Sequence, residues 1–299
     1  MKNRLYCIAV KSEKQINAEI LAAVDYIIFC PGEYTEKTVL AFINNMQSFF
    51  NSPVPVTPPC IYLNLPVVAM AEDIKVLRKL LENKNIKEKF SGVVANNVYA
   101  LKLAGEYGLN VFKGPWMNTL NDNFCGYENV VLSPELSESE YRLFGDWDKK
   151  NYFLCVYGYL PLMTLAHCPY QVNGIECHRG RSADTKRSEV PQRGGGNLLS
   201  AVCMNSVPVT RTARLQYKDE LNNVMNIRRT KLSKCYFELL NSVPLNLLKH
   251  KNKIKPHYYF DMRETEPVEI SRILKLFKEP GNKDPEGKHT AGLYFKELK

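Results

Sequence analysis

The stretch Pro256-His-Tyr-Tyr-Phe-Asp-Met262 decides the fold, because it supplies an eighth strand to a chain whose first 157 residues already hold seven. It is a short aromatic and apolar run typical of a buried strand, and Glu266–Lys278 after it has apolar residues at helical spacing. Strands that alternate with helices predict a parallel sheet. We expect an α/β fold in which this sheet closes as a TIM-like (β/α) barrel, with an open doubly wound sheet as the alternative.

The seven earlier strands are expected at short apolar runs bounded by polar or turn residues. These runs are Leu5–Val10, Tyr26–Cys30, Cys60–Leu65, Gly92–Ala95, Asn110–Lys113, Val130–Ser133 and Tyr152–Tyr157. Apolar residues at three- and four-residue spacing predict helices between them. These helices cover Thr35–Phe50, Ala71–Ile86 and Tyr99–Tyr107.

Local signals mark several helix ends. Ser12 with Gln15, and Ser137 with Glu140, have the spacing of a capping box, which predicts that a helix begins at each serine. Gly108 is placed to end the helix before it, because glycine readily adopts the left-handed conformation of a helix end.

A long, irregular and polar segment, residues 158–255, separates the seventh and eighth strands. We interpret it as a cysteine-bearing insertion into a barrel formed by residues 1–157 and 256–299, within a single integrated domain. The insertion would leave strand seven at its carboxyl end, where barrel enzymes carry out their chemistry.

Four of the nine cysteines lie in this insertion, outside any apolar run. They are Cys168, Cys177, Cys203 and Cys235. Cysteines that serve as small hydrophobic residues usually lie inside strands or helices, as we expect of Cys7, Cys30, Cys60 and Cys155. A shared metal or cluster explains the other four most economically. Thiolates select zinc, copper(I) or iron–sulfur centres, and the absence of a Cys-x-x-Cys pair favours a cluster over a structural zinc site. A mixed zinc site completed by His167 and His178 is the alternative.

Positive charge is concentrated beside these cysteines. The chain has a net charge of +9, and residues 178–234 contain twelve Lys and Arg residues against four Asp and Glu residues, a net charge of +8. This excess predicts a contact with RNA phosphates or another anionic substrate, with a solvated loop as the alternative. The substrate-binding candidates are Arg179, Arg181, Arg187, Arg193, Arg228 and Arg229.

Three residues are candidates for a catalytic role. Tyr157 and Tyr159, around the end of strand seven, would stack on a base, although core packing explains them equally well. His167 is the third, because it adjoins Cys168. The sequence has no Gly-x-Ser-x-Gly elbow and no His-Glu-x-x-His helix, so these residues do not themselves indicate peptide hydrolysis.

Several strings are shared with a known family. The most specific are Val156-Tyr-Gly-Tyr-Leu-Pro-Leu-Met163 with His167-Cys168-Pro169, and Cys235 leading into Asn241-Ser-Val-Pro-Leu-Asn-Leu247. With Leu132–Leu136, Asn96-Asn97 and Thr290–Phe295, they resemble the U32 peptidase family, often labelled collagenase-like proteases. The chain departs from the family at Tyr159, where arginine is common, and at Ala291 and Leu293, where arginine and histidine are usual.

The resemblance implies a barrel in which Cys168, Cys177, Cys203 and Cys235 hold a [4Fe-4S] cluster. It also implies oxygen-independent hydroxylation of tRNA, ribosomal RNA or a quinone precursor, with a prephenate-like hydroxyl donor and a partner U32 domain or subunit. Two other functions stay open: a collagenase-like peptidase, and a non-catalytic module whose cluster staples an RNA-binding loop.

The sequence contains no expected membrane helix. No stretch approaches the roughly 18 apolar residues of such a helix, and the apolar run at Leu5 is too short for a signal peptide. We therefore expect a cytoplasmic protein without a membrane partner, in which the cysteines stay reduced.

Overall fold

The computed structural model describes residues 4–50, 58–121, 126–165, 169, 216–281 and 287–295. The chain divides into two compact units. Unit 1 comprises Met1–Tyr159 and Val243–Lys299, and unit 2 comprises Leu160–Ser242. Within the described residues, no helix is long and apolar enough to cross a lipid bilayer.

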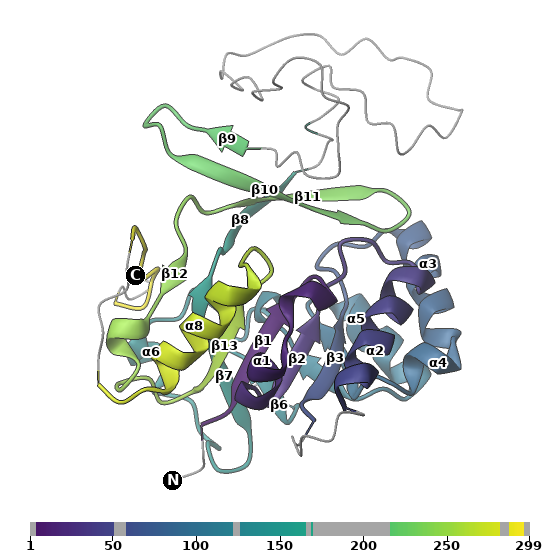
Figure 1. Cartoon of the computed structure of the whole chain (residues 1–299), viewed down its shortest axis with the longest axis horizontal. Helices are drawn as coiled ribbons and strands as arrows, with labels where there is room; N and C mark the ends of the chain where they lie inside the picture. The colour runs from purple at the N-terminus through teal and green to yellow at the C-terminus, as the bar shows by residue number, and fades with distance from the viewer. Residues whose placement is uncertain are drawn as a thin grey trace. The chain divides into compact units, whose positions relative to one another are not determined.

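Unit 1 is a closed barrel of eight parallel strands (Figure 1). The strands are β1 (Tyr6–Val10), β2 (Tyr26–Phe29), β3 (Cys60–Asn64), β4 (Gly92–Ala95), β5 (Val111–Lys113), β6 (Asn129–Val131), β7 (Asn151–Gly158) and β13 (His257–Asp261). The ring closes because β7 pairs with both β6 and β13, and β13 pairs in turn with β1. The TIM-like barrel expected from the sequence is therefore confirmed, and the open sheet is wrong.

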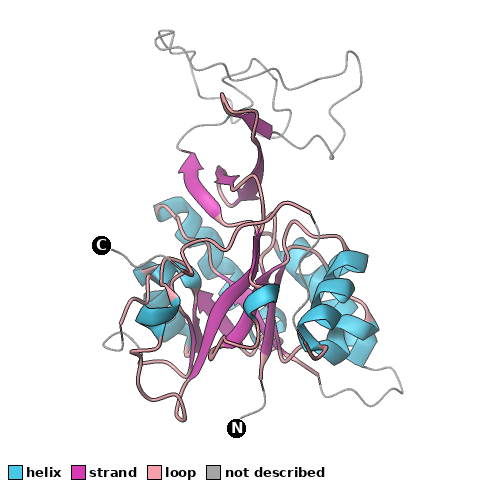
Figure 2. Cartoon of the chain, turned by 90° about the vertical axis from the view of Figure 1, so that its left-hand side faces the viewer, coloured by secondary structure: helices cyan, strands magenta, loops and turns pink. Residues whose placement is uncertain are grey.

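Helices surround the strands of this barrel (Figure 2). They are α1 (Ala18–Ala23), α2 (Glu36–Phe50), α3 (Ala71–Glu82), α4 (Lys84–Lys87), α5 (Val98–Tyr107), α6 (Glu138–Tyr141) and α8 (Pro267–Lys278). Short 3-10 helices lie at η1 (Glu13–Gln15), η2 (Pro115–Met117) and η4 (Leu248–His250). After β5 the described residues form only η2, so this strand lacks the full helix that an ideal repeat would place there.

Two of the three predicted helix-end signals are confirmed. Gly108 ends α5 with a φ of 60°, and Ser137 and Glu140 form the capping box of α6. The Ser12 prediction is wrong, because Ser12 caps only η1 and α1 begins later, behind Asn17. The Gln15 side chain instead donates to the carbonyls of Met262 and Thr265, 2.7 and 2.8 Å away. These bonds join η1 to the loop after β13.

Aromatic side chains fill the barrel near the amino ends of its strands. The rings of Tyr26 on β2, Phe112 on β5 and Phe153 on β7 lie 5.1 to 5.7 Å apart by their centroids. These strands are not neighbours in the ring, so the contacts must cross the interior. The interior is therefore a packed core and not a pore, as in other barrels of this class.

The register of β7 changes near its carboxyl end. Tyr259 of β13 lies opposite Cys155, whereas Phe260 lies opposite Tyr157, so Val156 is an extra residue in β7. Such a bulge turns the following side chains to the other face of the sheet. Phe260 packs on Phe277 of α8, with centroids 5.0 Å apart, so the Tyr157 side chain points outward toward this helix.

The carboxyl end of β7 also holds the return of the chain from unit 2. Strand β12 (Leu245–Asn246) pairs antiparallel with Tyr157 and Gly158. Thr290, in the C-terminal segment Thr290–Phe295, forms a bridge with Leu245, and Tyr294 hydrogen-bonds the Tyr141 hydroxyl of α6 at 3.1 Å. This segment therefore joins α6 to β12 within unit 1.

Unit 2 contains a four-stranded antiparallel sheet in the order β8-β11-β10-β9. The strands are β8 (Pro161–Leu165), β9 (Gln216–Lys218), β10 (Val224–Lys231) and β11 (Cys235–Leu240). The chain enters unit 2 directly after β7 and leaves it shortly before β12. Both connections are thus attached to the carboxyl end of β7. The cysteines expected in this segment, apart from Cys235, lie outside the described residues.

Candidate functional site

The carboxyl end of the barrel carries a buried ion pair. Asp261, the last residue of β13, accepts hydrogen bonds from Arg263 Nε at 2.7 Å and Nη2 at 2.5 Å. The Asp261 side chain is 5% exposed and the Arg263 side chain 12%. Since Tyr259 faces the barrel interior with Cys155, alternation along β13 turns Asp261 to the same side. This places a bidentate, charge-assisted pair where barrels of this type bind substrates.

Amide and hydroxyl groups extend this polar end across neighbouring strands. Asn96, after β4, donates to Asn64 Oδ1 at 2.8 Å and to the Leu65 carbonyl at 3.0 Å. The Tyr34 hydroxyl, after β2, donates to the Asn64 carbonyl at 2.7 Å. Asn96 Oδ1 is buried and accepts no hydrogen bond within the described residues, and it lies where a side chain at Gly114 would have to be.

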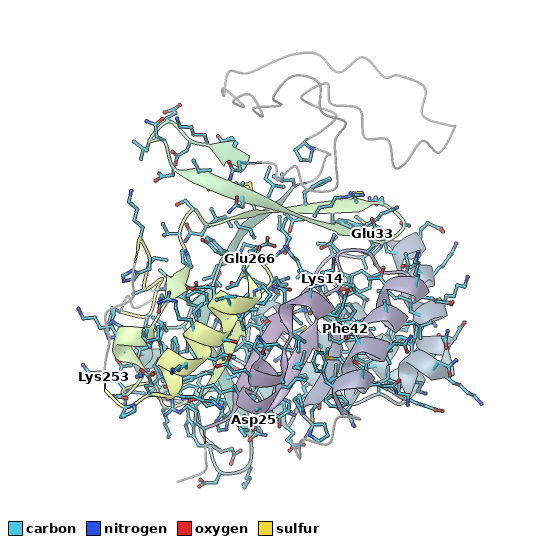
Figure 3. All side chains as sticks on the ribbon, in the orientation of Figure 1. Lys14, Asp25, Glu33, Phe42, Lys253 and Glu266 are labelled. Carbon is cyan, nitrogen blue, oxygen red and sulfur yellow. The ribbon has the colours of Figure 1, made fainter. Side chains whose placement is uncertain are left out.

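Figure 3 shows that residues which follow different parallel strands of unit 1 lie toward the same end. Lys14 and Glu33, which follow β1 and β2, lie toward one end together with Glu266, which follows β13. Asp25, which precedes β2, lies toward the opposite end, where its carboxylate accepts from the Tyr6 amide at 2.7 Å. The polar groups around Asp261 therefore share one end because each follows a parallel strand.

Buried thiols lie on and just after strands of the barrel. Burial raises the pKa of Cys7, with Cys30 and Asp25 adding to the shift. Burial also raises the pKa of Cys155, and the Asp261 carboxylate adds to it. Both thiols are therefore protonated at neutral pH and are poor nucleophiles. Cys7, Cys30 and Cys155 are buried as expected, whereas Cys60 is exposed, which corrects the expectation for that residue.

Tyrosines near the ion pair are also held in their neutral form. Burial raises the pKa of Tyr34 and Tyr259, and the nearby Arg263 guanidinium offsets a small part of the shift. These hydroxyls are hydrogen-bond donors at neutral pH. The barrel end thus combines the Asp261–Arg263 pair, and the Lys11–Glu264 pair at 3.0 Å, with several neutral hydroxyls.

Cys235 is the predicted cluster ligand that the structure describes. It begins β11 opposite Lys231, and its sulfur accepts a hydrogen bond from Arg229 Nε at 3.1 Å. Strand alternation places Cys235 and Arg229 on the same face of the sheet as Phe237. A cationic N–H donor beside the sulfur stabilises negative charge there, as a metal-bound thiolate requires.

Arg228 differs from the expectation of a substrate contact. It is buried, 7% exposed, and its Nε donates to Glu238 Oε2 at 2.8 Å across the β10–β11 pair. Because the Arg228 side chain is buried and paired with Glu238, we omit it from the residues proposed to contact phosphates. Alternation explains the difference from Arg229, since neighbouring residues of a strand face opposite sides.

Most of the other predicted site residues lie outside the described residues. They are His167, Cys168, Cys177, Arg179, Arg181, Arg187, Arg193 and Cys203. Within the part of the chain that is described, no three His, Cys, Asp or Glu residues group as metal ligands would. Their predicted roles therefore stay predictions.

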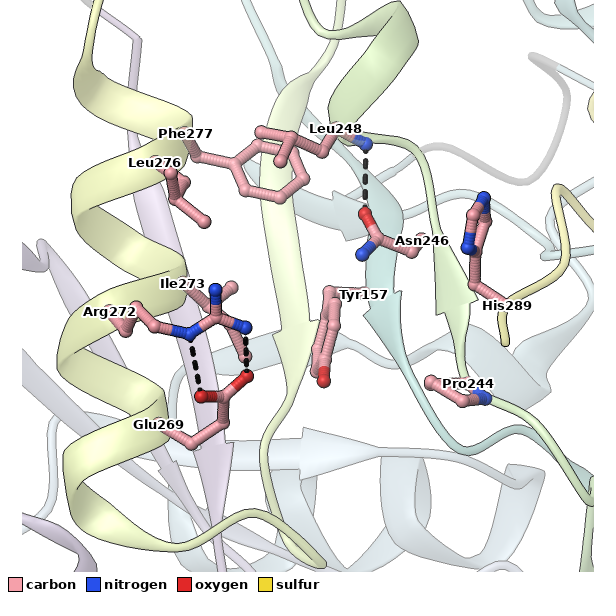
Figure 4. Close-up of a pocket in the computed structure, with 10 residues that line it drawn as sticks. All are labelled: Tyr157, Pro244, Asn246, Leu248, Glu269, Arg272, Ile273, Leu276, Phe277 and His289. Atoms are coloured by element: carbon pink, nitrogen blue, oxygen red, sulfur yellow. Dashed lines mark hydrogen bonds and ion pairs between the residues drawn. The ribbon is translucent and has the colours of Figure 1, made fainter. Parts of the chain in front are cut away.

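Tyr157 lies in a cavity of unit 1 (Figure 4). The cavity is lined by α8 on one side and by β12 and the residues after it on the other, with His289 at its edge. Burial raises the pKa of Tyr157 to about 12, and Glu269 and the half-buried Tyr159 add to the shift. The register change in β7 is what brings this hydroxyl to the outer side of the barrel.

The sequence did not single out Asp261, Arg263 or Asn64. Their signal was present, because each is a polar residue at or just after the end of a predicted strand. Comparison of the chain with family models, with curated proteins and with solved structures finds no match.

Proposed function

We propose that this chain is an iron–sulfur enzyme of the α/β-barrel type that hydroxylates RNA without molecular oxygen, as its resemblance to the U32 family implies. The observation that carries the proposal is the Arg229–Cys235 contact, at 3.1 Å, in a segment attached to the carboxyl end of β7. A thiol with a cationic donor and an adjoining basic segment suit both a cluster and an RNA backbone.

The donor set fits a [4Fe-4S] cluster, which four thiolates hold. Cys168, Cys177, Cys203 and Cys235 would be the ligands, and Arg229 would donate its hydrogen bond to the last of them. When bound, the cluster supplies redox or Lewis-acid chemistry. Zinc is the alternative occupant, because thiolates also bind zinc.

The basic side chains of unit 2 would recruit the RNA. Lys234 lies over the Tyr236 ring, 5.3 Å from its centroid, at the turn between β10 and β11. Lys218, Lys231 and Arg229 add positive charge on β9 and β10. With Arg179, Arg181, Arg187 and Arg193, they would contact phosphates.

The polar barrel end would bind the reacting groups. Hydroxylation replaces a C–H bond of the base by C–OH, a two-electron oxidation, so a prephenate-like donor must give up its oxygen and accept those electrons. A neutral hydroxyl such as that of Tyr259 suits the orientation of such a donor, since it remains protonated at neutral pH. A partner U32 domain or subunit would complete the assembly.

The test is nucleoside mass spectrometry of tRNA and ribosomal RNA from cells with and without the gene, grown without oxygen. We expect a nucleoside one oxygen atom heavier than its parent to disappear in the deletion strain. The wild-type gene should restore it, and Cys235→Ala should not. RNA that is unchanged by the deletion, together with peptide cleavage by cluster-free protein, would support the peptidase instead. Unchanged RNA together with retained RNA binding would support the non-catalytic module.

A further inference from the structure

We propose that the cavity between α8 and β12 binds a small carboxylate of one to three carbon atoms. The inference is independent of the proposed RNA hydroxylation, since every lining residue belongs to unit 1 and lies on the outer side of the barrel. It follows from the hydrogen-bond donors in the cavity, from its size and from its charge.

Two polar groups in the cavity offer donors. Tyr157 is 8% exposed, and its hydroxyl makes no hydrogen bond within the described residues. The Asn246 side chain accepts from the Leu248 amide at 3.0 Å through Oδ1, which leaves its Nδ2 directed into the cavity (Figure 4). Both groups can therefore donate to an acceptor-bearing ligand that enters the cavity.

The charge of the cavity permits an anion. Glu269 accepts from Arg272 Nε and Nη2, both at 2.7 Å, so the acid and base neutralise one another at the rim. Tyr157 remains protonated, because burial raises its pKa to about 12. A carboxylate that enters therefore meets two N–H or O–H donors and no net negative charge, and it forms charge-assisted bonds.

The size of the cavity limits the ligand. It encloses about 40 Å³, well below the roughly 150 Å³ in which an engineered protein cavity holds benzene. An aromatic ring is therefore excluded, and so is a prephenate-like molecule. Ile273, Leu276 and Phe277 form an apolar wall that suits a short alkyl group.

The test is ligand-observed NMR and calorimetric titration of the full chain with formate, acetate, propionate and the uncharged isostere acetamide. We expect acetate or propionate to bind at least tenfold more tightly than acetamide. Asn246→Asp keeps the acceptor for the Leu248 amide but removes the donor and adds negative charge, so it should weaken acetate binding at least tenfold. Tyr157→Phe should also weaken it, whereas Tyr107→Phe, which removes a surface hydroxyl bonded to Glu82, should not.

The proposal fails if the wild-type protein binds none of these carboxylates at millimolar concentration, or binds acetamide equally well. Acetate binding unchanged by both Asn246→Asp and Tyr157→Phe would also overturn it, because the site would then lie elsewhere. Wild-type binding is measured without any variant, so loss of folding in a variant cannot hide the outcome. The RNA assay reports on the proposed function separately.

Discussion

Gly158 and Asp261 lie side by side at the carboxyl ends of β7 and β13, so closely that a side chain at residue 158 has no space. A Cβ there would lie 2.5 Å from the Asp261 carbonyl oxygen and 2.6 Å from its Cβ, and Gly158 has a φ of 137°. We predict that Gly158→Ala lowers the free energy of unfolding by more than about 1 kcal/mol, measured by urea denaturation.

Gly105→Ala is the matched control. Gly105 lies within α5 and has open space around its missing Cβ. Alanine favours a helix interior over glycine by about 0.5–1 kcal/mol, so this variant should be more stable than the wild type. Equal effects of the two substitutions would contradict the close approach at Gly158.

The Asp261–Arg263 pair makes a second prediction. Asp261→Asn leaves the guanidinium buried without its counter-charge, which should cost about 3 kcal/mol of stability. The double variant Asp261→Asn, Arg263→Met should be less destabilised than the sum of its single variants, because the two side chains are coupled. Additive losses in denaturant unfolding would show that the pair contributes nothing.

The buried tyrosines predict a loss of stability at high pH. Burial raises the pKa of Tyr62, Tyr157 and Tyr258 to about 12 in each case, above the ordinary value of 10.0. A phenol that stays protonated in the folded state but ionises in the unfolded chain stabilises the fold fully below pH 10, and this contribution is lost as the pH rises toward 12. Melting temperatures should fall steeply over that interval, and less steeply in Tyr62→Phe. Parallel curves for both proteins would exclude Tyr62 as a contributor.

Arg229 makes the fourth prediction. A donor to a ligating sulfur raises the reduction potential of a cluster, since it stabilises the added negative charge. Arg229→Met should therefore make the midpoint potential of the purified protein more negative, while its iron content is retained. Lys218→Met, which removes a charge from β9 without touching Cys235, is the control. An equal shift in both variants would indicate a general effect of charge and not the contact.

The sequence predicts this barrel well because each strand is a compact apolar run. All eight predicted strands appear, with ends that differ by at most two residues, as at Asn110–Lys113 against Val111–Lys113. The error at Ser12 arises because Gln15 Oε1, which could have closed a capping box, accepts from the Lys11 amide at 2.8 Å, while Gln15 Nε2 donates to carbonyls some 250 residues away in the sequence. Local spacing cannot reveal a partner so distant.

The site was less predictable for the same physical reason. The extra residue Val156 turns the Tyr157 side chain away from the barrel interior, and no sequence pattern predicts a bulge at this position. Arg228 and Arg229 are chemically alike in the sequence, yet one is buried against Glu238 and the other reaches Cys235. Their different roles follow from strand pairing, which only the fold specifies.

The most direct test of the iron–sulfur proposal is anaerobic purification with a visible absorption spectrum and iron and sulfide analysis. It is applied to the wild type, Cys168→Ala, Cys235→Ala and the control Cys60→Ala, which removes an exposed thiol of unit 1. We predict sulfur-to-iron charge-transfer absorption with equal iron and sulfide, lost in the Cys168 and Cys235 variants and kept in Cys60→Ala. A colourless wild-type protein that contains zinc or no metal would contradict it.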